Sequence, residues 1–188
     1  MNGKLKIEKD WSLFLDRDGV INKRLPDEYV KHPDDFEFIP GVTEAMAILA
    51  GIFHPVIVVT NQQGIGKGLM TADQLEKIHQ KMRSGIAEKG GRIDQVFFSP
   101  DLADSRSFSR KPAVGMGLSA RKQFPGIRFR KTIMAGDSYS DILFGHRLGM
   151  TTVLIGTDMN VARQCGDLLN YRFDDLLSFA CEVEKSSK

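Results

Sequence analysis

Two aspartates separated by a single residue, Asp16 and Asp18, follow the apolar run at residues 13–15. Two carboxylates this close cannot both be buried as anions without a positive charge nearby, because desolvated like charges repel strongly. A divalent cation such as Mg²⁺ supplies that charge and prefers oxygen ligands. Asp137 and Asp141, far along the chain, would complete the carboxylate cluster. The pattern predicts a magnesium site; the plainer alternative is a turn or a helix cap after a strand.

The same pair of aspartates can carry out covalent chemistry on phosphorus. Asp16 can act as a nucleophile and form an aspartyl-phosphate. Asp18 can then protonate the leaving oxygen and later deprotonate the attacking water. Gly19, the next residue, lets the backbone turn sharply and lets a phosphate approach closely. This division of labour predicts phosphoryl transfer.

Thr60 and Lys111 provide the other groups that such a reaction needs. Phosphoryl transfer depends on positioning and on stabilising the charge of the equatorial oxygens. The hydroxyl of Thr60 can donate a hydrogen bond, and Lys111 can supply a positive charge. Taken singly, Thr60 is an ordinary β-branched strand residue and Lys111 a solvated residue at a helix start. Together with the carboxylates, both are expected to bind the phosphoryl group.

Short apolar runs alternate with longer helical patterns, which is typical of parallel βαβ units. We expect an α/β fold with a Rossmann-like, doubly wound parallel sheet. The expected strands are residues 12–16, 56–60, 95–99, 132–136, 152–155 and, at an edge, 171–173, and the expected helices are residues 43–51, 71–89, 115–123, 140–148 and 174–184. The second helix carries an apolar stripe and begins with a capping-box pattern, Thr71 and Gln74.

The chemically capable residues follow the ends of these strands. Asp16 ends the first strand, residues 60–61 end the second and Asp137 follows the fourth. Lys111 comes after a polar surface loop at residues 101–110 and is expected to open a helix. In an open parallel sheet, ligands bind outside the carboxyl ends of the strands. One site at that edge is therefore predicted.

Bulk properties narrow the class of protein. The 188 residues suit a single domain over residues 1–188, with its core at about residues 11–180. A formal net charge of +2 favours neither nucleic acid nor a membrane surface as a partner. The N-terminus is polar, unlike a signal peptide, and no apolar run is long enough to span a membrane. A cytoplasmic protein is expected, as a monomer or small homo-oligomer that binds a small phosphorylated metabolite.

Cysteines and histidines show no metal-binding or catalytic pattern. Cys165 and Cys181 lack a CxxC or Cys/His arrangement and are expected to be reduced thiols. The four histidines, including His79, are scattered along the chain and are expected on the surface or in ordinary packing. Trp11 and Phe14 are expected in the core.

Four segments in order resemble the four motifs of the haloacid dehalogenase superfamily phosphatases. They are residues 14–22 (FLDRDGVIN), 58–62 (VVTNQ), 110–112 (RKP) and 136–141 (GDSYSD). The resemblance extends from about residue 13 to residue 155. Four motifs in the right order form a specific signal, whereas DxDG alone would be weak.

This resemblance implies a role for each matching residue. It implies Asp16 as nucleophile, Asp18 as general acid and base, and Thr60 and Lys111 as phosphate ligands. Mg²⁺ would be held by Asp16, the backbone carbonyl of Asp18 and Asp137. Asp141 would support that site without binding the metal directly, or would orient Lys111.

The spacing of the motifs also bears on the branch of the superfamily. Residues 18 and 60 are 42 positions apart and residues 60 and 111 are 51 apart, so neither gap has room for an inserted cap domain. The amino-acid sequence around the motifs is most similar to that of the capless members that act on heptose 1,7-bisphosphate or on histidinol phosphate. The resemblance thus implies a phosphomonoester hydrolase, with a sugar bisphosphate as the first candidate substrate and histidinol phosphate as the alternative.

By the same resemblance, the substrate contacts fall in residues 24–27, 60–63 and 110. The implied substrate-binding residues are Arg24, Asn61, Gln62, Gln63, Arg110 and Ser138. For Arg24, a solvent-exposed charge is an equally good interpretation. Arg110 suits a second phosphate, because a guanidinium binds such a group with two hydrogen bonds.

The chain departs from many of these relatives in one respect. They hold a structural zinc ion in the loop after the third strand, with three cysteines and a histidine. Residues 98–109 here contain neither residue type, so no zinc is predicted. A function of another class, a phospho-accepting receiver module, also uses Asp, Thr, Lys and Mg²⁺. In receivers, however, the accepting aspartate follows the third strand, and the equivalent of Asp18 is missing.

Overall fold

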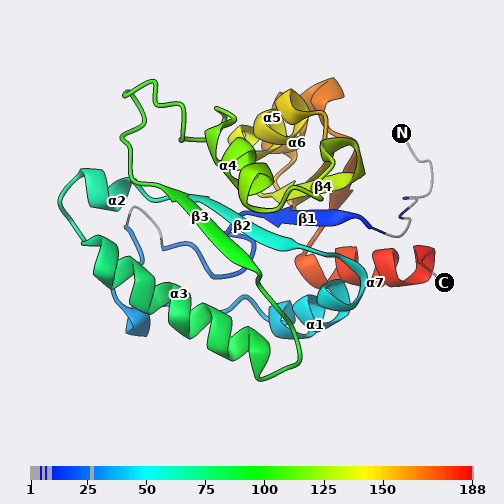
Figure 1. The fold of residues 1–188 in the computed structure, drawn as a ribbon, viewed down its shortest axis with the longest axis horizontal. Coiled ribbons are helices and arrows are strands. Elements are labelled where there is room, and N and C mark those ends of the chain that lie inside the picture. Colours follow the sequence, from blue (N-terminus) through cyan, green and yellow to red (C-terminus); the bar gives the residue numbers. More distant parts are fainter. Residues whose placement is uncertain (1–4, 6, 8–9, 26–27, 188) are drawn as a thin grey trace.

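The structure is a computed structural model that describes residues 5, 7, 10–25 and 28–187. The polar N-terminal stretch, apart from Leu5, and residues 26–27 of the predicted contact segment lie outside the described residues. The described part of the chain forms a six-stranded parallel sheet with the order β3-β2-β1-β4-β5-β6 (Figure 1). The strands are β1 (Ser12–Leu15), β2 (Val56–Asn61), β3 (Gln95–Ser99), β4 (Thr132–Gly136), β5 (Thr151–Ile155) and β6 (Tyr171–Phe173).

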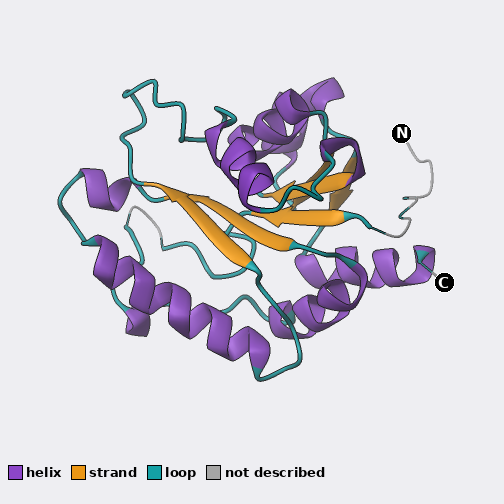
Figure 2. Cartoon of the chain, viewed as in Figure 1, coloured by secondary structure: helices purple, strands orange, loops and turns teal. Residues whose placement is uncertain are grey.

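Helices cover both faces of this sheet (Figure 2). One face carries α1 (Val42–Ile52), α3 (Ala72–Ala87) and α7 (Leu176–Ser186), and the other carries α4 (Gly115–Gln123), α5 (Tyr139–Leu148) and α6 (Met159–Cys165). The short α2 (Gln63–Gly66) follows β2 directly, and 3-10 turns lie at Pro33–Asp35, Phe129–Lys131 and Gly166–Leu168. The three-layer arrangement confirms the predicted Rossmann-like α/β fold.

Alternation along the central strand explains why both faces are covered. Leu13 and Leu15 pack into the core on the side of α1, α3 and α7, whereas Phe14 packs into the core on the side of α4 and α5. Successive side chains of a strand point to opposite faces, so an apolar run needs helices on both sides. Trp11 is only partly buried and packs at the margin of the first core.

The longest helix shows how the sequence specifies its own ends. In α3, the stripe Leu75, Ile78, Met82 and Ile86 is buried, as a 3.6-residue period requires. Thr71 Oγ1 accepts from the backbone of Gln74 at 3.1 Å, and the side chain of Gln74 accepts from the backbone of Thr71 at 2.8 Å. The predicted capping box is confirmed.

Differences from the sequence-based expectation are local. All six strands and five helices lie within one or two residues of their predicted bounds, but α2 and α6 were not predicted. Lys111 does not open a helix, because α4 begins at Gly115. The polar segment at residues 101–110 forms a loop, as predicted.

In the described residues, the connections between the strands contain no inserted domain. Between β1 and β2 lie one 3-10 turn and α1, and between β2 and β3 lie α2 and α3. None of the described helices has the length and hydrophobicity that a membrane span requires.

The amino ends of the strands form the edge opposite the predicted site. An apolar cavity of about 700 Å³ lies there. Its lining residues are Asp10, Ile52, His54, Pro55, Gln123, Phe124, Pro125, Gly126, Ile127 and Arg128. The predicted site residues are absent from this lining, so the two edges of the sheet differ in character.

Candidate active site

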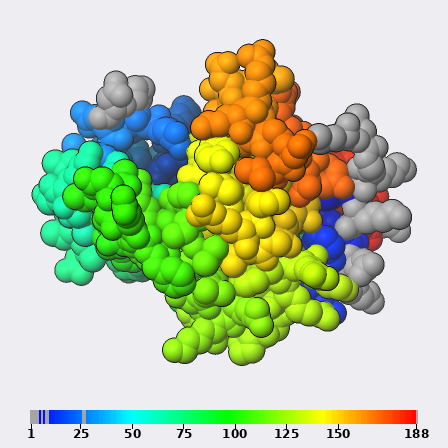
Figure 3. Space-filling model, turned by 90° about the horizontal axis from the view of Figure 1, so that it is seen from above, coloured from blue at the N-terminus to red at the C-terminus, as the bar shows by residue number. Residues whose placement is uncertain are grey.

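A polar cavity of about 560 Å³ opens at the carboxyl ends of β1 and β2. In the view from above, the yellow and orange atoms of α5 and α6 stand on one side and the cyan and green atoms on the other, with blue atoms of the N-terminal segment between them (Figure 3). The lining residues are Asp16, Arg17, Asp18, Arg24, Leu25, Glu28, Tyr29, Val30, Thr60, Asn61, Gln62, Gln63, Arg110, Lys111, Ser138, Ser140 and Asp141. Every predicted site residue except Asp137 therefore lines one cavity.

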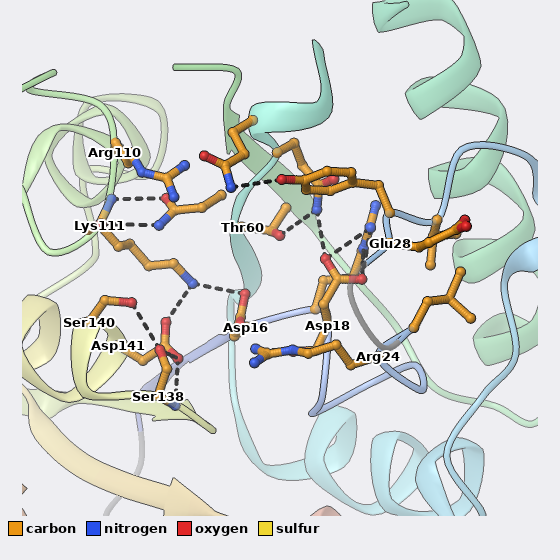
Figure 4. A pocket seen from close by; sticks show the side chains of 17 residues that line it. Asp16, Asp18, Arg24, Glu28, Thr60, Arg110, Lys111, Ser138, Ser140 and Asp141 are labelled. Atoms are coloured by element: carbon orange, nitrogen blue, oxygen red, sulfur yellow. Dashed lines mark hydrogen bonds and ion pairs between the residues drawn. The ribbon is translucent and has the colours of Figure 1, made fainter. Parts of the chain in front are cut away.

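Lys111 joins two acidic residues from distant parts of the chain (Figure 4). Its buried Nζ donates to Asp16 Oδ1 at 2.8 Å and to the carbonyl of Val59 at 2.7 Å. It also forms an ion pair with Asp141 Oδ1 at 2.6 Å. Burial alone would lower the pKa of Lys111, but the charges of Asp141 and Asp16 outweigh it and raise that pKa. Lys111 is therefore a fixed positive charge beside the proposed nucleophile.

Asn61 explains how a loop residue holds this position. Its side-chain amide donates to the backbone carbonyl of Lys111 at 3.0 Å and accepts from the backbone N–H of the same residue at 2.9 Å. Because Asn61 ends β2, the pair of bonds ties the loop to the sheet. Asn61 lines the cavity, and its amide positions Lys111; the predicted contact with substrate stays a prediction.

Three carboxylates meet beside Lys111. Asp16, Asp137 and Asp141 each offer an oxygen within 4.8 Å of the others. Burial, followed by the neighbouring acids, raises the pKa of Asp137 to about 8, and burial raises that of Asp16 to about 6 in spite of Lys111. When all three carboxylates are ionised, the cluster therefore holds more buried negative charge than Lys111 balances. A divalent cation with oxygen ligands fits this excess.

Glycines make the close approach of these acids possible. Gly19 has a φ of +92°, and a Cβ on it would lie 1.9 Å from Asp137 Oδ2. A Cβ on Gly136 would lie 2.2 Å from the Cβ of Asp141. Any side chain at either position would push an acidic residue out of the cluster, since such contacts are far inside van der Waals distance.

Arg24 lies against Asp137 at one side of the cluster. Its Nη2 donates to Asp137 Oδ1 at 3.0 Å and to the backbone carbonyl of Asp18 at 3.2 Å. Asp137 itself lines a neighbouring cavity of about 300 Å³, and Arg24 lines both cavities. Arg24 therefore separates Asp137 from the larger cavity.

Asp18 is held by donors on several sides. Arg17, which is fully buried, donates to both of its carboxylate oxygens at 2.9 Å. Asn22 donates to Oδ1 at 3.0 Å and Gln62 to Oδ2 at 2.8 Å. Burial pushes the pKa of Asp18 upward, but the charge of Arg17 and these hydrogen bonds lower it overall. The arrangement holds Asp18 as an anion that can accept a proton.

Gln62 connects Asp18 to the predicted phosphate ligand Thr60. Its Nε2 also donates to Thr60 Oγ1 at 2.8 Å. Because the oxygen of Thr60 already accepts this bond, the hydroxyl hydrogen remains able to donate into the cavity. Gln62 was predicted to bind substrate; its side-chain N–H groups are instead directed to these two residues.

The outer wall of the cavity is formed by Gln63, Tyr29 and Arg110. Gln63 Nε2 donates to the hydroxyl of Tyr29 at 2.8 Å, and Lys67 Nζ donates to the same oxygen at 3.0 Å. Arg110 Nη1 donates to the backbone carbonyl of Asp101 at 3.0 Å. This end of the cavity therefore carries positive charge and hydrogen-bond donors.

Ser138 caps the helix that follows β4. Its hydroxyl and its backbone N–H both donate to Asp141 Oδ2, at 2.6 and 3.0 Å. Ser138, predicted to bind substrate, thus lines the cavity, and its hydroxyl donates a hydrogen bond to Asp141. The other oxygen of Asp141 faces Lys111, so the capping bonds fix the acid that orients the lysine.

Three residues of the site were not predicted. No role was predicted for Arg17, Tyr29 or His79, although Arg17 lies inside the first motif, between the two aspartates. His79 is buried on α3, and its Nε2 lies 3.4 Å from Arg17 Nη1. An arginine flanked by two acids is the signal that could have marked Arg17, because a charge so placed is readily paired in the interior.

The loop before Arg110 is organised around one carboxylate. Asp101 Oδ2 accepts hydrogen bonds from the hydroxyls of Ser99, Ser107 and Ser109. Ser99 ends β3 and Ser109 immediately precedes Arg110, so the cluster ties the loop to the sheet next to the cavity.

Comparisons with known proteins agree with the fold and with the site. A family model described as HAD-hydrolase-like matches residues 108–177. The chain is 34% identical over 173 residues to the D-glycero-alpha-D-manno-heptose-1,7-bisphosphate 7-phosphatase of Mycobacterium bovis, covering 92% of this chain and 91% of the relative. It is 34% identical to the D-glycero-beta-D-manno-heptose-1,7-bisphosphate 7-phosphatase of Vibrio cholerae, covering 81% of this chain and 85% of the relative.

A solved structure is similar over nearly the whole chain. It is the crystal structure of the D,D-heptose 1,7-bisphosphate phosphatase of B. bronchiseptica, complexed with magnesium and phosphate. The TM-score is 0.85 at 30% sequence identity, and the match covers 94% of this chain and 99% of that chain.

Proposed function

The chain belongs to the haloacid dehalogenase-like family of phosphatases, and from this premise we propose that it hydrolyses one phosphomonoester of a sugar bisphosphate of the heptose 1,7-bisphosphate kind. The observation that carries the proposal is the contact of Lys111 with both Asp16 and Asp141 in a cavity that Thr60 and Asp18 also line. Family membership also excludes a receiver-like signalling module.

The proposed reaction begins on Asp16. Its Oδ1 is held by Lys111, so Oδ2 is the oxygen we assign to the attack on phosphorus. Asp18, an anion in the free protein, first takes up the proton of the phosphate monoester's own P–O–H group. The attack then forms an aspartyl-phosphate and breaks the bond from phosphorus to the sugar oxygen, which leaves with that proton from Asp18. Thr60 donates its hydroxyl hydrogen, and Lys111 contributes its charge, to the oxygens of the transferring group.

The second half of the reaction restores the aspartate. Asp18, now an anion, accepts a proton from a water molecule whose oxygen attacks the phosphorus and releases inorganic phosphate. The donors around Asp18 suit this half, because they stabilise the anion that takes the proton. The clamp formed by Arg17, Asn22 and Gln62 also fixes where that anion lies.

Mg²⁺ is proposed as the cofactor. Asp16, the backbone carbonyl of Asp18 and Asp137 would hold it, and when bound it neutralises charge on the carboxylates and on the phosphoryl group. The excess of buried carboxylates over lysine supports this assignment.

Arg110 supports a substrate with a second phosphate. Arg110 lines the end of the cavity that Gln63 and Tyr29 form. A second positive charge lies close by, because Lys67 Nζ is 5.3 Å from the centre of the Tyr29 ring. These groups would attract an anion and repel an amine. The polarity therefore favours a bisphosphate over histidinol phosphate, which carries an amino group.

Replacing the proposed nucleophile tests the chemistry. Asp16→Asn should lower kcat to below about one thousandth of the wild-type value, because an amide does not form the acyl-phosphate. Activity should also be lost on adding EDTA and regained with Mg²⁺. Circular dichroism checks that the variant is folded, and Asp104→Asn, on the exposed part of the loop at residues 101–110, is the matched control. Full turnover by Asp16→Asn would contradict the mechanism.

The substrate assignment has its own experiment. A steady-state screen should include heptose 1,7-bisphosphate, heptose 7-phosphate and histidinol phosphate. Arg110→Leu should lower kcat/KM for the bisphosphate by about 10-fold or more, since a charged hydrogen bond contributes about 1.5–3 kcal/mol, and should change the monophosphate value little. An equal loss on both sugars would contradict a subsite for the second phosphate.

A further inference from the structure

Arg24 contacts the two oxygen-bearing groups that lie on the metal-binding side of the cluster. One guanidinium nitrogen, Nη2, lies 3.0 Å from each carboxylate oxygen of Asp137 and 3.2 Å from the backbone carbonyl of Asp18. A positive group that bridges a carboxylate and a carbonyl satisfies the same acceptors that a hard cation would.

The surroundings of Arg24 allow it to leave this position. Its side chain is 58% exposed, whereas that of Asp137 is 17% exposed. It lines both the larger and the smaller cavity, so a rotation of the side chain alone would connect Asp137 with the larger one. By contrast, Lys111 is fixed by two carboxylates and a carbonyl in the interior. The cluster thus has one fixed and one removable positive charge.

We propose that Arg24 is an internal counter-ion that occupies the cation position of the cluster and competes with Mg²⁺ for Asp137 and the carbonyl of Asp18. This inference rests on the proposed function, since it takes the magnesium site of that proposal as given. Binding of the metal requires the guanidinium to swing out toward solvent, and loss of the metal lets it return. The apparent affinity for Mg²⁺ is therefore the intrinsic affinity multiplied by the fraction of molecules in which Arg24 has left the site.

The competition also has a function for the free protein. Three partly or fully buried carboxylates near one lysine repel one another strongly without a further positive charge. Arg24 supplies that charge and keeps Asp137 facing Asp18. The cluster is thereby held close to the arrangement that binds metal.

Direct measurement of Mg²⁺ binding tests the inference. Titration calorimetry with MgCl₂ alone, in metal-free buffer at constant ionic strength, compares the wild type with Arg24→Gln. The variant should bind Mg²⁺ about 2- to 5-fold more tightly, the upper part of the range expected for removal of a partly exposed ion pair that competes for the site. Substrate turnover is not needed for this readout.

Lys23→Gln is the matched control. It removes the same charge from the adjacent residue, whose Nζ pairs with Glu37. The control should change the Mg²⁺ affinity by less than about twofold, because an exposed charge away from the cluster is screened by solvent and salt. Arg24→Lys keeps the charge, but its side chain is shorter and carries a single nitrogen. Its Mg²⁺ affinity should lie between those of the wild type and Arg24→Gln.

The outcomes separate this inference from the proposed function. If the wild type binds Mg²⁺ and Arg24→Gln binds it with unchanged or weaker affinity, the competition is overturned and the magnesium site stands. If Arg24→Gln and Lys23→Gln tighten binding equally, net charge explains the effect and the bridging contact is overturned. If the wild type binds no Mg²⁺ at millimolar concentration, the proposed cofactor fails, and the competition fails with it.

Discussion

At the scale of single residues, the site depends on side chains that hold other side chains. Asn61, Gln62 and Ser138 were predicted to bind substrate, yet their polar groups are directed to Lys111, Thr60 and Asp141. Buried polar groups must be paired, and each of these three side chains pairs with a neighbour of the proposed machinery. Their binding of substrate stays a prediction. The polar lining therefore serves largely to fix the reacting groups.

Gly19 provides a residue-scale prediction. Gly19→Ala should lower Mg²⁺ affinity and kcat/KM by about 100-fold or more, because the new Cβ would lie 1.9 Å from the carboxylate of Asp137 and displace a proposed ligand. Calorimetry and steady-state kinetics measure the two effects.

Gly90→Ala is the control for backbone strain. Gly90 also has a positive φ, +82°, but a Cβ there meets nothing within 4 Å. Both variants should lose about 1 kcal/mol of unfolding free energy from the left-handed conformation. Only Gly19→Ala should lose metal binding, and equal metal affinity in the two variants would contradict the proposed role of Asp137.

Residue identity alone predicted part of the site and missed the rest for physical reasons. Asp16, Thr60 and Lys111 were expected together because they follow the carboxyl ends of parallel strands, whose positions can be inferred from apolar runs. The buried pair of Arg17 and His79 could not be inferred, since the burial of an arginine depends on partners supplied by the tertiary fold. For Arg24, the sequence allowed two interpretations, a solvent-exposed charge and a contact with substrate. Its contact with Asp137 was not predicted.

At the scale of elements, the loop between β3 and α4 presents both Arg110 and Lys111. A hydrogen-bonded cluster around Asp101 holds the base of this loop. The serine hydroxyls and the carboxylate provide a cross-link that needs no metal ion.

The loop yields a prediction for Asp101. Asp101→Ala should speed proteolysis and amide hydrogen exchange within residues 99–110, because three hydroxyls lose their acceptor at roughly 0.5–1.5 kcal/mol each. It should also lower kcat/KM about 3- to 10-fold, because the segment that carries Arg110 is then tied less firmly to the sheet. Asp104→Ala, in an exposed part of the same loop, is the control and should leave both properties unchanged. Unchanged exchange in Asp101→Ala would contradict the cross-link.

Helix α3 carries a pH-dependent contact. Burial, and then the charge of Arg17, lowers the pKa of His79 to about 3, so the folded protein keeps this histidine neutral. The unfolded chain binds a proton near pH 6.5, and the contribution of neutral His79 to stability is therefore complete above that pH and lost as the pH falls toward 3.

This contact predicts a difference in acid sensitivity. Between pH 7.5 and 5, the unfolding free energy of the wild type should fall by about 1–2 kcal/mol more than that of His79→Gln, since each unit is worth about 1.4 kcal/mol. Urea denaturation at several pH values measures the slope. His146→Gln, at an exposed histidine of α5, should behave as the wild type, and parallel curves for His79→Gln and the wild type would refute the assignment.

The elements differ in how well the sequence predicted them. The six strands and α3 were expected because apolar runs and a 3.6-residue stripe extend over enough residues to be seen. The helices α2, with four residues, and α6, with seven, span too few turns to show a period. Lys111 was wrongly expected to begin a helix, because Pro112 favours such a position while the contacts of Lys111 with Asn61 and Asp141 depend on tertiary structure.

At the scale of the whole molecule, we propose that residues 1–188 form one folding unit without a cap. Both helical layers pack on one sheet, and apolar clusters cover its two faces. Thermal or urea unfolding should then be a single transition, with coincident midpoints from Trp11 fluorescence and from far-ultraviolet circular dichroism. Two separated midpoints would contradict a single unit.

The two edges of the sheet have a practical consequence for handling the enzyme. The reactive cavity opens at the carboxyl ends of the strands, and the apolar cavity near Pro55 and Phe124 lies at the opposite ends. A bead or electrode coupled through the exposed end of α4, at Lys122, would turn the reactive mouth toward the medium. Coupling through Lys67 would turn the opening of the cavity toward the support and block access of the substrate.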